Sequence, residues 1–414
     1  MASQKSRTIA AGTIGNFLEW YDFAIYGYFA ATIGATFFPR EDPVAQVLAA
    51  FGIFAVGYLM RPLGGVIIGT IGDRFGRRTA LMVSVTSMAV PTFLVGLLPG
   101  YQTLGVAAPI LLTFLRMIQG LSVGGEGTTS MVFLVEQAPP GRRGLIGALG
   151  AVSATGGLLL GSGTGAVFAA ILSPEALASW GWRIPFLFGL GVGVAGWWLR
   201  RHVVETDREP TRTPLADTLR HHGMLVARLA GLVAFNAVGL YLMFLYIVSW
   251  LQTVDGMAPA RALEMNTASM LAMLPVLLGA GWLSDRIGRR PLLIAANALA
   301  FVSAVPLFWL MHHPDPVLVL AGQMGFVITV GTCLGIMSSI MVEATPRAVR
   351  CTAIAIGYNV TFGILGGLTP LAAAWLIDRT AMDLSPAFMI MAAAAISFVS
   401  VLFYRESYRD EEAA

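Results

Sequence analysis

The sequence predicts an all-α polytopic membrane protein whose twelve transmembrane helices form two pseudo-symmetric six-helix bundles. Three observations predict this fold class: an apolar composition, a series of long apolar runs, and a repeat that relates the two halves of the chain. Of the 414 residues, 56% are hydrophobic and only 12% are charged. Soluble proteins carry about 25% charged residues, so this chain has too little charge to cover a water-soluble globule.

The predicted helices follow from the apolar runs, because a helix that crosses a bilayer needs about 20 mostly apolar residues. The first six helices are expected near 8–32, 44–70, 79–98, 107–136, 144–172 and 183–201. The uncharged run 79–115 is divided at Pro99-Gly100, a turn signal. The last six are expected near 224–251, 264–283, 291–311, 316–342, 350–377 and 385–404.

The longest charged stretch follows the sixth predicted helix and divides the chain. We therefore expect an N-terminal bundle over 1–201, a cytoplasmic linker over 202–223 and a C-terminal bundle over 224–414.

The basic residues predict the orientation in the membrane. With the N-terminus inside, 20 of the 26 basic residues fall in cytoplasmic segments, four fall on the opposite side and two lie within spans. This asymmetry is a strong positive-inside signal, so both termini are expected to be cytoplasmic in a multi-pass protein of the cell inner membrane. Because the arginines form short clusters rather than a continuous basic face, a nucleic-acid partner is not expected.

Two sequence repeats relate the halves. Gly69–Arg78 (GTIGDRFGRR) recurs as Gly281–Arg290 (GWLSDRIGRR), 212 residues later. Glu136 with Pro139 and Arg143 recurs as Glu343 with Pro346 and Arg350 at an offset of 207. Parallel repeats of this kind relate the two halves of certain transporters about an axis along the membrane normal.

The G-x-x-x-D-R-x-G-R-R loops resemble the signature of the major facilitator superfamily. Four further motifs resemble its metabolite–proton symporter branch, which includes α-ketoglutarate, citrate, shikimate and proline/betaine transporters: Gly15–Phe23 (GNFLEWYDF), Met60–Gly65 (MRPLGG), Gln119–Glu126 (QGLSVGGE) and Trp180–Phe186 (WGWRIPF). The segment 366–376 is most similar to the proline/betaine and citrate members.

This resemblance implies the major facilitator fold and proton-coupled uptake of a small organic solute by alternating access. The implied substrate is a carboxylate-bearing metabolite or a zwitterion, such as proline/betaine or a di- or tricarboxylate. A proton-coupled exporter on the same fold is the alternative. It is disfavoured because the family's antiporters carry a Gly-Pro element in the fifth helix, whereas 144–172 has no proline.

Charged residues inside the predicted spans are the main candidates for function, because a charge at the bilayer centre costs about 2.5–3.5 kcal/mol on insertion scales. They are Glu19, Asp22, Arg61, Arg116 and Glu126, all in the first half. Either they form structural ion pairs or an acid among them carries the proton. A carboxylic acid holds its proton more tightly in an apolar cavity, and an approaching guanidinium weakens that hold. Asp22 or Glu19 is favoured as the proton carrier, with Glu126 third and Arg116 as the coupled cation.

Arg116 is also the candidate for reading a substrate carboxylate, since a guanidinium forms two parallel hydrogen bonds with that group. In the competing interpretation, Arg116 only balances one of the acids. Arg61 lies nearer the cytoplasmic end of its span, so helix-end pairing is favoured for it. The expected substrate-site residues are Arg116, Tyr26, Gln119, Tyr358, Asn359, Tyr241 and Asn236.

The resemblance implies that the charged loops close the inner side of the outward-facing state. The expected gating residues are Asp73, Arg74, Arg77, Glu136, Arg143, Asp285, Arg286, Arg289, Glu343 and Arg350.

Enzymatic chemistry is not predicted, because no HExxH, Walker loop or Cys/His cluster is present. No cofactor and no metal site are expected, and Cys333 and Cys351 suggest no disulfide framework. The expected partners are a small-molecule substrate, protons and the lipid bilayer, with the chain acting as a monomer.

Overall fold

The computed structural model describes residues 17, 19–39, 42–75, 77–124, 126–136, 138–139, 141–200, 215–404 and 406. Within these ranges some side chains are not described, and those of 72–78 and Glu126 are among them. The described residues form helices and short connections, as the sequence predicts.

The first membrane helix is helical over 19–37, with a turn at Phe29. Its last part is α2, and the rest of the first half follows in this order: α2 (Ala30–Phe37), α3 (Pro43–Leu59), α4 (Arg61–Phe75), α5 (Arg77–Leu97), α6 (Tyr101–Leu104), α7 (Ala107–Val123), α8 (Glu126–Glu136), α9 (Arg143–Ile171), α10 (Pro174–Ala176), the π-helical η1 (Leu177–Gly181) and α11 (Arg183–Arg200).

The second half begins with α12, which contains a break at His222. Its elements are α12 (Leu215–Tyr241), the π-helical η2 (Leu242–Tyr246), α13 (Ile247–Thr253), α14 (Pro259–Ile287), α15 (Arg289–Met311), α16 (Pro316–Glu343), the 3₁₀ turn η3 (Arg347–Val349), α17 (Arg350–Val360), the π-helical η4 (Thr361–Gly366), α18 (Gly367–Thr380) and α19 (Pro386–Leu402).

Among the described residues, seven helical stretches are long and apolar enough to cross a membrane, and three shorter apolar helices accompany them. Several predicted spans agree with the structure within two residues: 144–172 with α9, 183–201 with α11, 291–311 with α15 and 316–342 with α16. Large apolar side chains such as Val302, Trp309 and Phe403 are more than 60% exposed, which suits contact with lipid rather than water.

Two helix starts have a local cause in an Asp-Pro pair. The carboxylate of Asp42 accepts a hydrogen bond from the backbone N–H of Val44 at 2.8 Å, and Asp315 accepts one from Val317 at 2.9 Å. Each aspartate satisfies a backbone donor that has no partner inside the helix. The proline that follows fits the first helical position, so α3 and α16 begin there.

Four predicted spans are interrupted. The span 44–70 is divided between α3 and α4 at Met60, and 107–136 is divided between α7 and α8. The spans 224–251 and 350–377 contain the π-helical stretches η2 and η4. π-helical turns change the helix register and often lie at functional sites.

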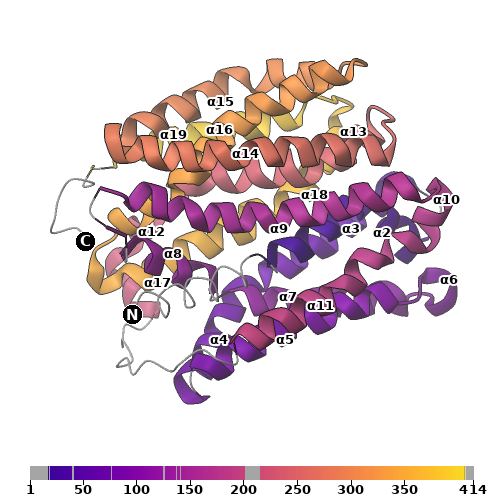
Figure 1. Cartoon of the computed structure of the whole chain (residues 1–414), viewed down its shortest axis with the longest axis horizontal. Helices are drawn as coiled ribbons and strands as arrows, with labels where there is room; N and C mark the ends of the chain where they lie inside the picture. The colour runs from indigo at the N-terminus through magenta and orange to yellow at the C-terminus, as the bar shows by residue number, and fades with distance from the viewer. Residues whose placement is uncertain are drawn as a thin grey trace.

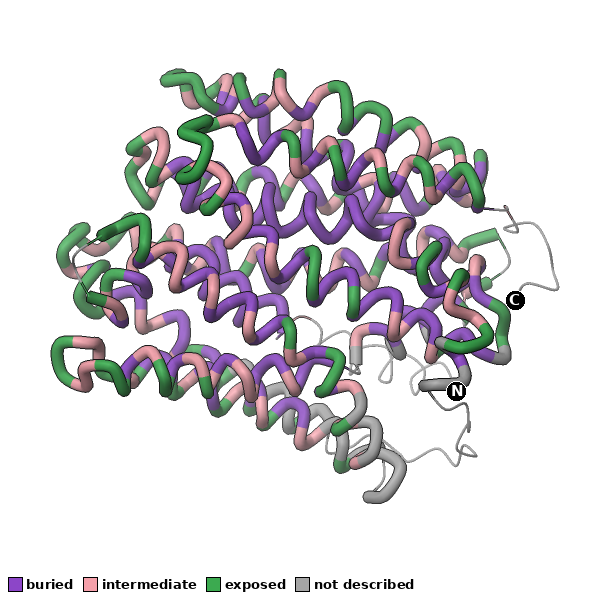
Figure 2. The backbone as a smooth tube through the Cα atoms, turned by 180° about the vertical axis from the view of Figure 1, so that it is seen from behind, coloured by how far each residue is buried: buried purple, intermediate pink, exposed green. Residues whose placement is uncertain are grey.

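The two halves lie on opposite sides of the molecule, with the indigo-to-magenta helices packed together and the orange-to-yellow helices packed together (Figure 1). Helices α9 and α14 lie side by side where the halves meet. Buried residues face the interior, whereas exposed residues follow the outer helix faces (Figure 2).

Glycines allow the closest approach of α9 and α14. A Cβ atom on Gly281 would lie 2.7 Å from the carbonyl oxygen of Gly144. Such small residues let two backbones approach closely in a membrane bundle, so this crossing would not tolerate a larger side chain without moving the halves apart.

Candidate functional site

Asp22 is the centre of a buried polar network in the first half, and only 1% of its surface is exposed. Arg116 Nη1 lies 2.7 Å from Asp22 Oδ2, and Gln119 Nε2 donates to Asp22 Oδ1 at 2.8 Å. The Thr92 hydroxyl donates to Asp22 Oδ1 at 2.5 Å. We call Asp22, Thr92, Arg116 and Gln119 the Asp22 network.

Thr92 was not predicted from the sequence to be a member of this network. Thr92 is one of several hydroxyl residues in α5, so no sequence signal distinguished it from the others. Arg116 and Gln119 lie three residues apart on α7, a spacing that places them on one helix face. Arg116 Nη1 also donates to Gln119 Oε1 at 2.8 Å, so the arginine and the glutamine hold each other beside the acid.

Aromatic rings of the first half enclose the Arg116 guanidinium. Its central carbon lies 4.1 Å from the centroid of Tyr26, 5.1 Å from that of Phe23 and 5.8 Å from that of Phe54. The Tyr26 hydroxyl donates to the carbonyl of Ala50 at 2.9 Å. The predicted residues Tyr26, Gln119 and Arg116 therefore lie together around Asp22.

A second buried ion pair joins Glu19 and Arg61. Arg61 Nη2 lies 3.1 Å from Glu19 Oε1, and Arg61 is only 2% exposed. Helix-end pairing was favoured for Arg61 from the sequence. Arg61 is the first residue of α4, and its partner is the buried Glu19 of the first helix. Since Glu19 and Asp22 are three residues apart on one helix face, the two pairs are neighbours.

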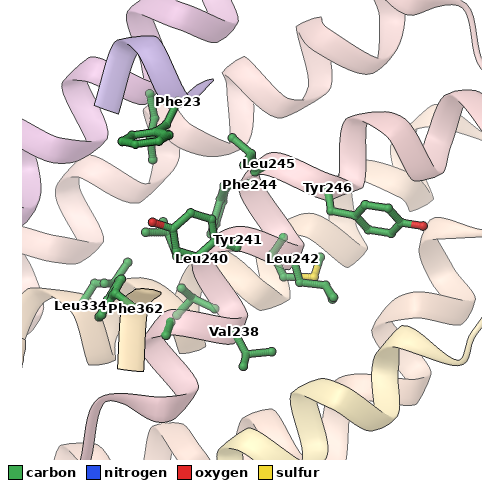
Figure 3. Packing of buried hydrophobic residues seen from close by; sticks show 14 of the residues in the cluster. Phe23, Val238, Leu240, Tyr241, Leu242, Phe244, Leu245, Tyr246, Leu334 and Phe362 are labelled. Carbon is green, nitrogen blue, oxygen red and sulfur yellow. The ribbon is translucent and has the colours of Figure 1, made fainter. Parts of the chain in front are cut away.

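The second half contributes tyrosines next to the Glu19–Arg61 pair. The Tyr241 ring centroid lies 5.1 Å from that of Tyr58 and 5.9 Å from that of Trp20. Tyr358 lies 5.9 Å from the Arg61 guanidinium carbon and stacks on Phe362 at 4.3 Å. Figure 3 shows Tyr241 between Phe23 of the first half and Phe362, while Tyr246 points away from them.

The other two predicted residues of the second half differ in position. Asn359 Nδ2 donates to the carbonyl of Gly124 at 2.8 Å, so it joins the halves next to the tyrosines. Asn236 Nδ2 donates to the carbonyl of Cys333 at 3.3 Å, which lies within the second bundle. Asn236 is therefore not brought together with the residues around Glu19 and Asp22.

The π-helical stretch η2 gives the halves a further contact. The Tyr28 hydroxyl donates to the carbonyl of Phe244 at 2.8 Å, and Asn266 Nδ2 donates to the same oxygen at 3.4 Å. A backbone carbonyl oxygen has two lone pairs and can accept hydrogen bonds from more than one donor. The Phe244 carbonyl in η2 accepts from Tyr28 of the opposite half and from Asn266 of its own half.

Charged contacts join the halves at one end of the molecule, which we call the arginine-rich end. Asp285 accepts hydrogen bonds from the backbone N–H groups of Gly144 and Leu145 at 2.7 and 2.9 Å, at the start of α9. A carboxylate at a helix N-terminus is favourable because it satisfies free donors and complements the dipole. Arg350 Nη1 lies 2.7 Å from Glu136 Oε1 of the first half.

The remaining predicted gating residues have different surroundings. Arg289 pairs with Asp285 and Glu343, each at 2.9 Å. Arg286 is exposed and stacks on Trp282 at 3.7 Å. Arg143 is the first residue of α9. The side chains of Asp73, Arg74 and Arg77 lie outside the described part of the chain, and so does the side chain of the predicted proton-site residue Glu126.

Among the described residues, no group of three or more His, Cys, Asp or Glu side chains could hold a metal ion. The central side chains instead provide two acids, two arginines, hydroxyls and aromatic rings. This set can bind an ionic solute and exchange a proton.

Two family models match the chain. Residues 8–208 match the model described as "Sugar (and other) transporter", and residues 248–414 match that of the Major Facilitator Superfamily.

Curated bacterial relatives align along nearly all of the chain. A glycine betaine/proline/ectoine/pipecolic acid transporter, OusA, of Dickeya dadantii is 33% identical over 97% of this chain and 83% of its own length. A proline/betaine transporter of Salmonella typhimurium is 34% identical with the same coverage.

Solved structures support the fold. The crystal structure of a D-xylose-proton symporter superposes with a TM-score of 0.78, covering 96% of each chain at 18% identity. This likeness supports the predicted twelve-helix arrangement in two bundles. The relatives are transporters and not enzymes, as the sequence predicts.

Proposed function

Because this chain belongs to the major facilitator superfamily of membrane transporters, we propose that it couples the entry of a proton to the uptake of a small zwitterion, such as proline or glycine betaine. The single observation that carries this proposal is the buried Asp22 network, in which one carboxylate has an arginine, an amide and a hydroxyl as partners. The names of the relatives support the substrate class.

Asp22 is the proposed proton carrier. In the charged form it accepts hydrogen bonds from three side chains, and Arg116 balances its charge. Protonation removes the ionic attraction and frees Arg116 to change its contacts, because a neutral acid interacts more weakly with a guanidinium. A proton and a substrate that enter together would thus favour a different arrangement of the first helix, α5 and α7.

Charge balance supports a zwitterion rather than a di- or tricarboxylate. The described central side chains contain two acids and two arginines in two pairs, Asp22–Arg116 and Glu19–Arg61. A zwitterion adds no net charge to this balanced site. A tricarboxylate would bring three buried negative charges, for which the described residues offer no additional arginines, and unpaired buried charge is costly.

The inter-half contacts at the arginine-rich end are the proposed gate. Asp285 at the start of α9 and the Arg350–Glu136 pair hold the halves together there. Contacts such as Tyr28 with Phe244 and Ser162 with Thr267, the latter at 2.7 Å, join the halves elsewhere. Alternating access requires that the two sets of contacts break in turn.

The proposed topology places the arginine-rich end and both termini in the cytoplasm, in a monomer of the cell inner membrane. The positive-inside distribution of arginines supports the orientation. The bundles are proposed to divide at a linker near 202–223. The described helix α9 has no proline, which favours uptake over the exporter alternative.

The proposed function is tested by an uptake panel in proteoliposomes with an inward proton gradient. The panel contains proline, glycine betaine, citrate, α-ketoglutarate and shikimate, each with and without a proton uncoupler. Uncoupler-sensitive accumulation of proline or glycine betaine is expected. Accumulation that is unaffected by the uncoupler would contradict proton coupling, and accumulation of citrate alone would contradict the substrate class.

The gate predicts that Arg350→Gln and Asp285→Asn open the arginine-rich end more often and slow transport, with little change in equilibrium substrate affinity. The exposed Cys351 is a native reporter at this end, while Cys333 is buried. Maleimide labelling of Cys351 should become several-fold faster in both variants. Arg347→Gln is the matched control, because it removes an exposed charge three residues from Arg350. Unchanged labelling with a selective loss of substrate affinity would contradict the assignment.

A further inference from the structure

Buried hydrogen-bonding atoms without a partner gather where the two halves meet. Arg61 Nε and Nη1 and the hydroxyls of Tyr58 and Tyr241 have no hydrogen-bond partner among the described residues. Arg61, Tyr58 and Tyr241 are each no more than 2% exposed. A buried donor without a partner is energetically unfavourable, so such a group of donors suits a ligand that supplies acceptors.

The unpartnered atoms belong to the Arg61 guanidinium and to the tyrosines near it. The Arg61 guanidinium carbon lies 5.1 Å from the Tyr58 ring centroid and 5.9 Å from that of Tyr358, and Tyr58 lies next to Tyr241. Tyr58, Tyr241 and Tyr358 are all close enough to Arg61 to interact with its charge. Arginine can only donate hydrogen bonds, and a tyrosine hydroxyl can donate one. The local chemistry is therefore that of a receptor for an anion with two oxygens.

Glu19 adds the opposite charge on one side of this receptor. It contacts Arg61 through Nη2 at 3.1 Å, whereas Nε and Nη1 of the guanidinium are buried without a hydrogen-bond partner among the described residues. Trp20, the next residue, lies 5.9 Å from Tyr241 between ring centroids. A carboxylate beside aromatic faces is a favourable environment for an ammonium or quaternary ammonium group.

We propose that the Glu19–Arg61 pair reads both charges of a zwitterionic substrate and thereby determines specificity. The substrate carboxylate accepts from Arg61 Nε and Nη1 and from the hydroxyls of Tyr58 and Tyr241. Its cationic group lies against Glu19 and the faces of Trp20 and Tyr241. This inference rests on the proposed function, since it assigns residues to the zwitterion that the transporter carries.

Arg116 is less suited to this role, although its Nε and Nη2 also lack partners. Its guanidinium is enclosed by Phe23, Tyr26 and Phe54, which all belong to the first half. Arg61 instead faces Tyr358 of the second half. A ligand held between Arg61, Tyr58 and Tyr241 would bridge the halves, as a substrate that controls alternating access must.

The test uses three ligands of nearly equal shape on the full-length purified transporter. Glycine betaine carries both charges, choline lacks the carboxylate, and 3,3-dimethylbutanoate has a carbon in place of the quaternary nitrogen. Calorimetry should show that glycine betaine binds about 30-fold or more tightly than either half-ligand, because each lost charged contact costs at least about 2 kcal/mol.

Single variants test the recognition of the substrate's carboxylate and of its cationic group one at a time. Arg61→Gln should remove the preference for glycine betaine over choline, and Glu19→Gln should remove its preference over 3,3-dimethylbutanoate. Tyr241→Phe should lower the affinity for glycine betaine about tenfold, because it removes one hydrogen bond to a charged group. Tyr246→Phe is the matched control, because Tyr246 lies five residues away and points elsewhere (Figure 3).

Removing one member of a buried ion pair can impair folding, so the double variant Glu19→Gln/Arg61→Gln provides a second test without a lone charge. It should bind all three ligands with similar, weak affinity. If the double variant and Arg61→Gln keep the glycine betaine preference while uptake stays proton-driven, the inference is overturned and the proposed function stands. If the wild-type protein carries neither glycine betaine nor proline, the proposed substrate class itself fails.

Discussion

Asp22→Asn is expected to abolish accumulation of substrate against its gradient while leaving exchange of substrate across the membrane partly intact. Asparagine keeps the shape and can still accept from Gln119 and Thr92, but it cannot take up and release a proton. With one proton per substrate, a gradient of about one pH unit supports about tenfold accumulation, since tenfold corresponds to about 1.4 kcal/mol. In the variant the accumulation ratio should fall to about one.

The measurement is radiolabelled uptake in proteoliposomes under an inward proton gradient, with counterflow into preloaded vesicles as the exchange assay. Glu19→Gln is the informative comparison, because Glu19 lies on the same face of the first helix and pairs with Arg61 instead. At saturating substrate, Glu19→Gln should still accumulate. Tenfold accumulation by Asp22→Asn would exclude Asp22 as the proton carrier, and loss of accumulation in Glu19→Gln alone would assign the proton to Glu19.

Arg116→Lys is expected to change the pH dependence of transport and to lower its rate roughly ten- to hundredfold, with substrate affinity nearly unchanged. In the wild-type protein, Arg116 Nη1 donates hydrogen bonds to both Asp22 and Gln119. A lysine keeps the charge but not the planar group that Phe23 and Tyr26 enclose. Losing a charge-assisted hydrogen bond of about 1.5–3 kcal/mol accounts for the expected size of the effect.

The pH profile of uptake and calorimetric affinity across pH separate the two interpretations of Arg116. A shifted profile with affinity within about twofold of the wild type would assign Arg116 to proton coupling. A loss of substrate affinity of about 30-fold or more at every pH would instead show that Arg116 binds the substrate carboxylate, as the sequence analysis predicts.

The sequence was sufficient to predict the fold because membrane helices leave long apolar runs. It also indicated Glu19, Asp22 and Arg116, because charges inside such runs are rare and costly. Their pairing could not be predicted in the same way. Spacing places Glu19 and Asp22 on one face, but only the crossing of helices determines that Arg116 lies beside Asp22 and Arg61 beside Glu19.

Other features depend on local irregularities or on the relation between halves. Arg61 begins α4 directly after the turn at Met60, and the packing of the helices in the bundle brings it to Glu19. Thr92 is one of many hydroxyl residues in membrane helices, so its contact with Asp22 has no unique signal. The repeat suggested Glu136 near Arg143, whereas the packing of the halves brings Glu136 to Arg350.

Substrate-driven proton entry tests the central claim most directly. Proteoliposomes that contain a pH-sensitive dye, with the membrane potential clamped and no initial pH gradient, receive external glycine betaine or proline. The wild-type transporter should acidify the interior as the substrate enters, whereas Asp22→Asn should let substrate equilibrate without acidification. Equal acidification per substrate in both proteins would contradict proton coupling through Asp22.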